Sequence, residues 1–162
     1  MRWDLLLIVL LEWGFAIAML ASAALDIRSR RLPNWMNLVV ALGFLPWAWA
    51  SGLAWDQMAI HVGIGIAVLG VGFVLFAAGV IGGGDAKLGA AIALWVGFSF
   101  DLLRFFIVMS LAGGVLAVFA LIWQKTTQRQ LTRALPYGVA IGAAGLDYWF
   151  RHSQAACVLS GC

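Results

Sequence analysis

The chain alternates between long apolar stretches and short polar segments. A helix needs roughly 20 apolar residues to cross a bilayer, and four of the six stretches reach that length. The fourth and sixth are shorter, so we expect them to be tilted or sheltered by neighbouring helices. The pattern predicts an all-α, polytopic membrane protein with about six transmembrane helices, roughly at Leu5–Leu25, Trp35–Trp55, Met58–Ile81, Ala86–Phe98, Leu102–Trp123 and Pro136–Phe150.

Composition agrees with this prediction. Hydrophobic residues make up 64% of the chain and charged residues only 10%, whereas soluble domains carry about 25% charged residues. Residues 1–162 are therefore expected to form a single integral-membrane domain in contact with lipid, without a soluble domain. Glycines within the third stretch, such as Gly63, Gly65, Gly70 and Gly72, suit close packing of membrane helices.

Two further classes of function are not expected. The ten basic residues form no basic-aromatic stripe in a soluble segment, which argues against nucleic-acid binding. The only cysteines, Cys157 and Cys162, lie at the C-terminal end, and a structural zinc or an iron–sulfur site usually needs four ligands. We interpret them as an incidental pair and expect neither metal nor cofactor.

The N-terminal residues resemble a secretion signal, because Arg2 precedes an apolar run that contains Ala21-Ser22-Ala23. Three features argue against cleavage. The run is too long for a signal-peptide core, Glu12 interrupts it, and a stronger basic cluster of Arg28, Arg30 and Arg31 follows it. We therefore expect a retained first transmembrane helix.

The basic residues also predict an orientation. With the N-terminus outside and six spans, the inner segments hold seven basic residues and the outer segments hold three, namely Arg2, Arg104 and Arg151. Cytoplasmic loops carry an excess of Lys and Arg, so both termini are predicted to lie outside. In this topology only two acidic residues, Asp26 and Asp85, lie at the inner ends of spans.

These two aspartates are the candidate catalytic residues. They are separated by 58 residues, yet the alternation of spans brings both to one membrane face, where ionisable residues usually mark a functional site. Two close carboxylates tend to share a proton. The ionised one can then activate water while the protonated one polarises a peptide carbonyl, as in aspartic proteases. The glycines before Asp85 are expected to permit positive φ and close approach of another chain.

The flanking residues carry a family resemblance. Gly82-x-Gly84-Asp85 resembles the Gly-x-Gly-Asp signature of the intramembrane aspartyl proteases, which include presenilin and the prepilin peptidases. Asp26 with Leu32-Pro33-Asn34 resembles the first-aspartate segment of prepilin peptidases, although Leu32 replaces the usual Ile. The run Pro136-Tyr137-Gly138-Val139-Ala140 is similar to their late Pro-Tyr-Gly segment.

The resemblance is closest to the short prepilin peptidases of tight-adherence pilus systems. It implies an enzyme of the bacterial inner membrane that cleaves prepilin or pseudopilin leader peptides on the cytoplasmic side, with Asp26 and Asp85 as catalytic residues. Larger members also N-methylate the mature pilin and have a cytoplasmic loop with four cysteines. This chain has no such loop, so methyltransferase activity is not expected.

Each of the candidate site residues also has a purely structural interpretation. Asp26 could cap a helix or pair with Arg28 or Arg30, and Asp85 could be the N-cap of the fourth helix. Lys87 either anchors at lipid headgroups or tunes the charge of Asp85. Pro33 and Asn34 start the second helix or contact substrate.

Glu12 lies about 21 Å along a helix from Asp26 and is expected to be a protonated or hydrogen-bonded residue facing the bundle, with a role in hydrating the interior as the alternative. His61 is expected to be structural. Two other classes of function remain open, a small transporter that uses the aspartates for cations or protons, and a non-enzymatic assembly subunit of a pilus or secretion machine.

Overall fold

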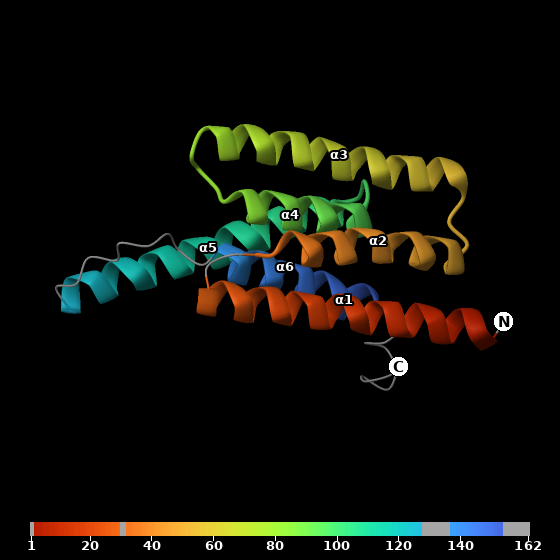
Figure 1. The fold of residues 1–162 in the computed structure, drawn as a ribbon, viewed down its shortest axis with the longest axis horizontal. Helices are drawn as coiled ribbons and strands as arrows, with labels where there is room; N and C mark the ends of the chain where they lie inside the picture. The colour runs from red at the N-terminus through yellow and green to blue at the C-terminus, as the bar shows by residue number, and fades with distance from the viewer. Residues whose placement is uncertain (1, 30–31, 128–136, 154–162) are drawn as a thin grey trace.

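A computed structural model describes residues 2–29, 32–127 and 137–153, and these residues form six helices. The predicted all-α architecture is therefore confirmed. The helices lie roughly side by side along one long axis, and α5 extends past the others at one end (Figure 1). They are α1 (Arg2–Ser29), α2 (Asn34–Ala50), α3 (Trp55–Ala77), α4 (Gly83–Val96), α5 (Phe100–Thr127) and α6 (Tyr137–His152).

Two predicted boundaries were wrong by several residues. Helix α2 ends at Ala50 rather than near Trp55, which instead begins α3. Helix α3 ends at Ala77 rather than near Ile81. Each end is followed by a turn containing a glycine with positive φ, Gly52 at 71° and Gly79 at 73°. Apolar residues continue through both turns, so hydrophobicity alone could not locate the helix ends.

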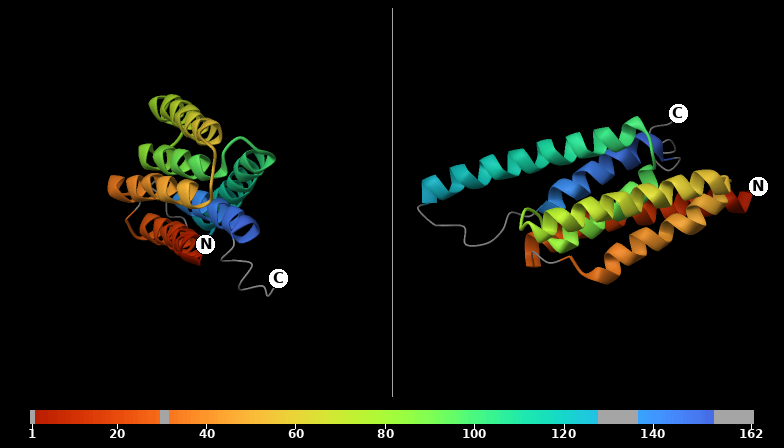
Figure 2. Two further views of the ribbon diagram at one scale, coloured as in Figure 1. Left: turned by 90° about the vertical axis from the view of Figure 1, so that its right-hand side faces the viewer. Right: turned by 90° about the horizontal axis from the view of Figure 1, so that it is seen from above.

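Helix α4 lies at the centre of the bundle. Nine of its fourteen residues are buried, and it packs against α2, α3, α5 and α6. The end-on view shows α4 beneath α3 and between α2 and α5 (Figure 2). A helix enclosed by protein can be shorter than one exposed to lipid, which accounts for the short fourth apolar stretch.

Small residues set the distance between α3 and α4. A Cβ atom added at Gly72 would lie 2.9 Å from the Cβ of Ala86, and one at Gly65 would lie 3.1 Å from Leu94. Gly63 and Gly70 have no such neighbour within 4 Å. The seven-residue spacing of Gly65 and Gly72 puts both on one helix face, so only this pair of the four glycines fulfils the packing prediction.

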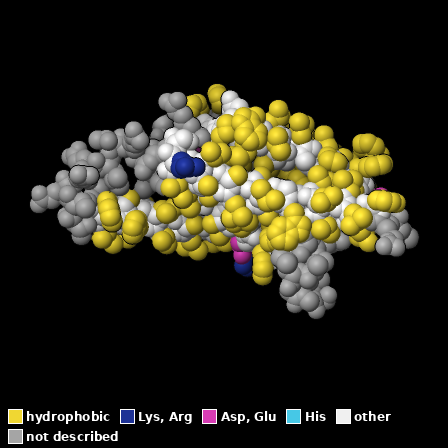
Figure 3. All heavy atoms as spheres, turned by 60° about the horizontal axis from the view of Figure 1, so that its bottom comes forward, with side chains coloured by type: hydrophobic (Ala, Val, Ile, Leu, Met, Phe, Trp, Pro, Cys, Tyr) yellow, Lys and Arg dark blue, Asp and Glu magenta, His cyan; other side chains and the backbone are white. Residues whose placement is uncertain are grey.

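The outer surface of the bundle is apolar. Hydrophobic side chains cover most of the face drawn in Figure 3, and charged side chains are few there. Three helices within the described ranges are long and apolar enough to cross a membrane, at Trp3–Ser29, Trp55–Ala77 and Phe100–Trp123. These features indicate a membrane protein.

Close packing of α6 on α1 leads to a first testable prediction. A Cβ added at Gly142 would lie 2.9 Å from the backbone carbonyl oxygen of Met19, an atom that cannot rotate away. Gly142→Leu should therefore separate the two helices and destabilise the protein by about 1–3 kcal/mol, the usual cost of overpacking. A thermal melt in detergent, followed by circular dichroism, measures the effect. Gly14→Leu on the open side of α1, with nothing within 4 Å, is the matched control, and equal melting of the two variants would contradict the prediction.

Candidate active site

Asp26 lies near the end of α1 and is held by the beginning of α6. Its side chain is only 6% exposed, and the backbone N–H of Gly138 donates a hydrogen bond of 2.7 Å to Oδ2. Gly138 is the second residue of α6, where backbone N–H groups have no partner within the helix. The first turn of α6 therefore provides a hydrogen-bond donor for a buried carboxylate. Arg28 is exposed, and Arg30 lies outside the described residues.

Asp85 lies in the first turn of α4 and is half-buried. Gly82, not Asp85, is the N-cap of this helix, so the interpretation of Asp85 as the N-cap residue was wrong. Its carboxylate instead turns back toward the preceding loop, where a Cβ added at Gly82 would lie 2.7 Å from Oδ2. This orientation resembles that of the side chain that reaches back in a capping box.

The fold brings the two aspartates together. The end of α1 and the beginnings of α4 and α6 meet at the left end of the bundle in Figure 1. Asp26 and Asp85 are close enough for the charge of one carboxylate to act on the other. Helix α6 packs on both α1 and α4 and so connects the two elements that carry the carboxylates.

The motif glycines allow close contact rather than an unusual backbone conformation. Gly82 has φ of −73°, and the positive-φ glycines in the described part of the chain are Gly52, Gly79 and Gly97. The expectation that the glycines before Asp85 supply positive φ was therefore wrong. An added Cβ would lie 2.7 Å from Asp85 Oδ2 at Gly82 and 3.0 Å from Leu32 Cβ at Gly84.

Gly138 likewise allows close contact with the other aspartate, Asp26. A Cβ there would lie 2.9 Å from both Cβ and Oδ2 of Asp26. The Gly-x-Gly-Asp and Pro-Tyr-Gly segments therefore both leave room for a carboxylate. Tyr137 is the first residue of α6, and a Cβ added at Gly113 of α5 would lie 3.2 Å from its ring. Pro136 lies outside the described residues.

Pro33, Asn34 and Lys87 join α2 to α4 at the same end. Pro33 is the N-cap of α2 and Asn34 its first residue, so the prediction that they start the second helix is confirmed. Lys87 Nζ donates a hydrogen bond of 2.9 Å to Asn34 Oδ1. Both side chains are exposed, and exposed polar contacts of this kind contribute little to stability.

Asn37 was not among the site residues predicted from the sequence. This side chain is only 5% exposed, and its Nδ2 donates a hydrogen bond of 3.3 Å to the backbone carbonyl of Gly84, directly before Asp85. Burying an amide is costly unless it is hydrogen-bonded. A polar residue one turn after Asn34, inside an apolar stretch, was the signal that could have identified it.

We expect Asn37 to position the Gly-x-Gly-Asp turn. Asn37→Leu removes the bond to Gly84 and should lower any catalytic activity that depends on Asp85 about 10- to 100-fold, since small displacements of catalytic groups cost about that much. Asn34→Leu, which loses only the exposed contact with Lys87, should stay within about threefold of wild type. Initial rates at equal amounts of inserted protein measure this, and a smaller loss for Asn37→Leu than for Asn34→Leu would contradict it.

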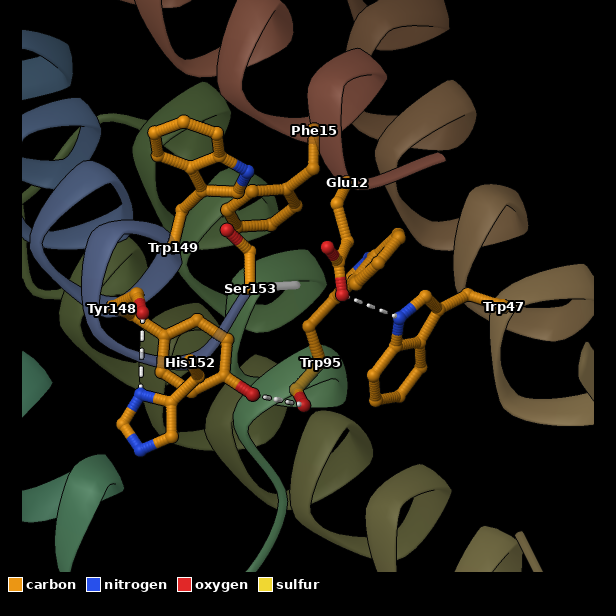
Figure 4. A pocket seen from close by; sticks show the side chains of 8 residues that line it. All are labelled: Glu12, Phe15, Trp47, Trp95, Tyr148, Trp149, His152 and Ser153. Carbon is orange, nitrogen blue, oxygen red and sulfur yellow. Dashed lines mark hydrogen bonds between the residues drawn. The ribbon is translucent and has the colours of Figure 1, made fainter. Parts of the chain in front are cut away.

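Glu12 lies in an aromatic pocket near the other end of the bundle (Figure 4). Its side chain is 6% exposed, and Trp47 Nε1 donates a hydrogen bond of 3.4 Å to Oε1. The pocket is about 20 Å³, room for about one water molecule. Glu12 is thus hydrogen-bonded and faces the bundle interior, as expected. The other residues that line the pocket are Phe15, Trp95, Tyr148, Trp149, His152 and Ser153.

His61 also has structural contacts. Its Nδ1 lies 2.8 Å from the carbonyl oxygen of Leu94, and its ring stacks on Phe44 with centroids 5.4 Å apart. It packs directly against Gly97, which follows α4. Among the described residues, no group of three His, Cys, Asp or Glu side chains is arranged to hold a metal ion.

Comparison with known proteins identifies the family. A model of the type IV leader peptidase family matches residues 13–118, which include both aspartates and the Gly82–Asp85 segment. The chain belongs to the type IV leader peptidase family. No curated protein and no solved structure is significantly similar to it. Membership indicates a protease of the prepilin peptidase kind and substrates of the prepilin type.

The region matched by the family model does not include α6. The matched region ends at residue 118, before α6 begins. The backbone N–H that donates a hydrogen bond to Asp26 nevertheless belongs to Gly138 of α6. A leader peptidase of this family would therefore need α6 folded onto α1 for the observed environment of Asp26. Both aspartates lie within the matched region, and the fold places them at the same end of the bundle.

Proposed function

We propose that the protein is an intramembrane aspartyl endopeptidase that removes leader peptides from prepilins or pseudopilins, with Asp26 and Asp85 as the catalytic pair. The supporting observation is the convergence of two carboxylates from helices far apart in sequence, in a chain of the leader peptidase family. The pair shares one proton. The ionised carboxylate takes a proton from water, and the protonated one donates to the oxygen of the scissile carbonyl.

The surroundings suit this chemistry. Asp26 is deeply buried and receives a backbone N–H, whereas Asp85 is more exposed and lies where α4 begins. A substrate therefore meets Asp85 from the surface, and Asp26 lies behind it. Gly82, Gly84 and Gly138 leave space around the carboxylates, while Pro33 and Asn34 begin α2 at the same end of the bundle and Lys87 contacts Asn34 there. Tyr137 packs the start of α6 on α5, and we assign Pro136 a supporting role as well.

The proposed topology has six spans, with both termini outside and the aspartates at the cytoplasmic face of the bacterial inner membrane. Two of the three basic residues assigned to the outside are paired with acids. Arg104 contacts Asp147 at 3.1 Å, and Arg151 contacts Asp101 at 2.9 Å. The support for this orientation is the count of Lys and Arg, seven in the inner segments against three in the outer ones.

Co-expression tests the proposed function. A tagged prepilin from the same cell is expressed with the wild-type protein or with the double variant Asp26→Asn/Asp85→Asn, and pilin size is measured on a gel. Conversion to the mature size with wild type only is the expected result. Full-length prepilin with both, when wild type is inserted, would contradict the proposal. Mass spectrometry of the mature N-terminus should find no added methyl group from this protein.

A further inference from the structure

An apolar groove leads from the lipid-facing surface to Asp85. Its cavity is about 350 Å³ and has walls from α3 and α5 and a floor from α4 and α6. The described lining residues are apolar apart from Asp85 and the Tyr137 hydroxyl. Figure 2 shows α5 diverging from the other helices. At one end the groove meets Asp85, a candidate catalytic carboxylate.

The dimensions of the groove match one face of a short helical segment. Along α3 its lining extends from Ile64 to Leu75, which is about 16 Å at 1.5 Å per residue. Leu75 lies near the end of α3 that connects to α4 and Asp85, while Ile64 lies nearer the middle. A helix is about 10–12 Å wide with its side chains, so a partner helix would rest between α3 and α5 with one row of side chains inserted.

A second groove on the opposite side of α4 serves as a comparison. It is larger, at about 600 Å³, and is lined by α2, α3 and α4, including Asn34, Asn37 and Lys87. Asp85 is not among its lining residues. A bound lipid chain needs no carboxylate, whereas a peptide to be cut must reach one. Contact with Asp85 therefore distinguishes the α3/α5 groove as the place for a substrate.

We propose that the groove between α3 and α5 binds an apolar helical segment of the substrate next to the scissile bond, and that the length of the groove sets how that bond reaches Asp85. This inference rests on the proposed function, because it assigns the substrate's apolar segment to a place on the enzyme. The occupant is a peptide helix with apolar side chains, held by van der Waals packing as membrane helices are. Its scissile bond lies beyond Leu75, at the Asp85 end.

Gly89 offers a way to block the groove without disturbing the fold. It is a buried residue of α4 that lines the groove, yet an added Cβ would have no neighbour within 4 Å. A side chain at this position would therefore extend into the cavity. Gly70 of α3 also has nothing within 4 Å but is exposed and lines neither groove, so it provides the matched control.

The test combines cleavage with photo-crosslinking to a tagged prepilin. Gly89→Phe should lower the cleavage rate at least about tenfold, and Gly70→Phe should leave it within about twofold. A benzoylphenylalanine is placed at Val71, which lines the groove, or at Phe73, which does not, in the Asp85→Asn background so that bound substrate stays intact. Crosslinking to prepilin should be at least about fivefold stronger from Val71, and Gly89→Phe should remove that difference.

The outcomes separate this inference from the proposed function. Normal cleavage by wild type with equal crosslinking from Val71 and Phe73 would overturn the groove assignment and leave the protease intact. Crosslinking of Val71 to lipid alone would also overturn it, in favour of an acyl chain. Strong prepilin crosslinking from Val71 without cleavage by inserted wild type would support the groove and contradict the protease. Circular dichroism of Gly89→Phe controls for folding, and the Val71 comparison does not depend on that variant.

Discussion

Replacing either Asp26 or Asp85 by asparagine is expected to lower leader cleavage by at least about 10³-fold, as for loss of a general acid or base. Asparagine keeps the size of the side chain and can still accept the hydrogen bond that Gly138 donates to Asp26. It cannot take a proton from water or carry the shared proton. The loss should therefore come from chemistry rather than misfolding.

The two single variants should be as inactive as the double variant, because the carboxylates act as one unit and such effects do not add. Cleavage rates with inserted protein at equal levels measure this. Asp56→Asn is the control, since Asp56 is exposed in the first turn of α3 and far along the chain from the site. If either catalytic variant retained a tenth of wild-type activity, that aspartate would have no acid–base role. Flux dependent on both residues, without cleavage, would favour a transporter.

Gly138→Val should have the second largest effect, about a 100-fold loss of cleavage, while the protein still inserts. The new Cβ would fall 2.9 Å from Cβ and Oδ2 of Asp26, so either Asp26 or the start of α6 must move. Movement of Asp26 by about 1 Å is enough to cost about 100-fold in rate. It would also disturb the 2.7 Å hydrogen bond from the Gly138 N–H.

Comparison with two other variants isolates this effect. Gly114→Val on α5, where nothing lies within 4 Å, should keep near-normal activity. Gly142→Leu should lower the melting temperature, yet its folded fraction should cleave better than Gly138→Val, since Gly142 contacts Met19 rather than Asp26. Cleavage per folded molecule and thermal melts should be measured together. Equal specific activity of Gly138→Val and Gly114→Val would show that the contact with Asp26 is unimportant.

Much of the fold could be predicted from the order of apolar and polar residues. Six apolar stretches correspond to six helices, and the two short ones correspond to α4 and α6. Hydrophobicity and charge are properties of individual positions, so the sequence alone was enough to predict the all-α class and an apolar outer surface. It was also enough to nominate Asp26 and Asp85 as candidates, and their catalytic role stays a prediction. The motifs also led to the family that the family model independently identifies.

Only the tertiary structure decided how these parts meet. The bond from Gly138 to Asp26 joins residues 112 positions apart, and that from Asn37 to Gly84 joins residues 47 apart. The role of the motif glycines, the importance of Asn37 and the groove beside Asp85 all depend on which side chain occupies the space next to a given backbone. That is a matter of helix packing in three dimensions, and no local pattern of residues specifies it.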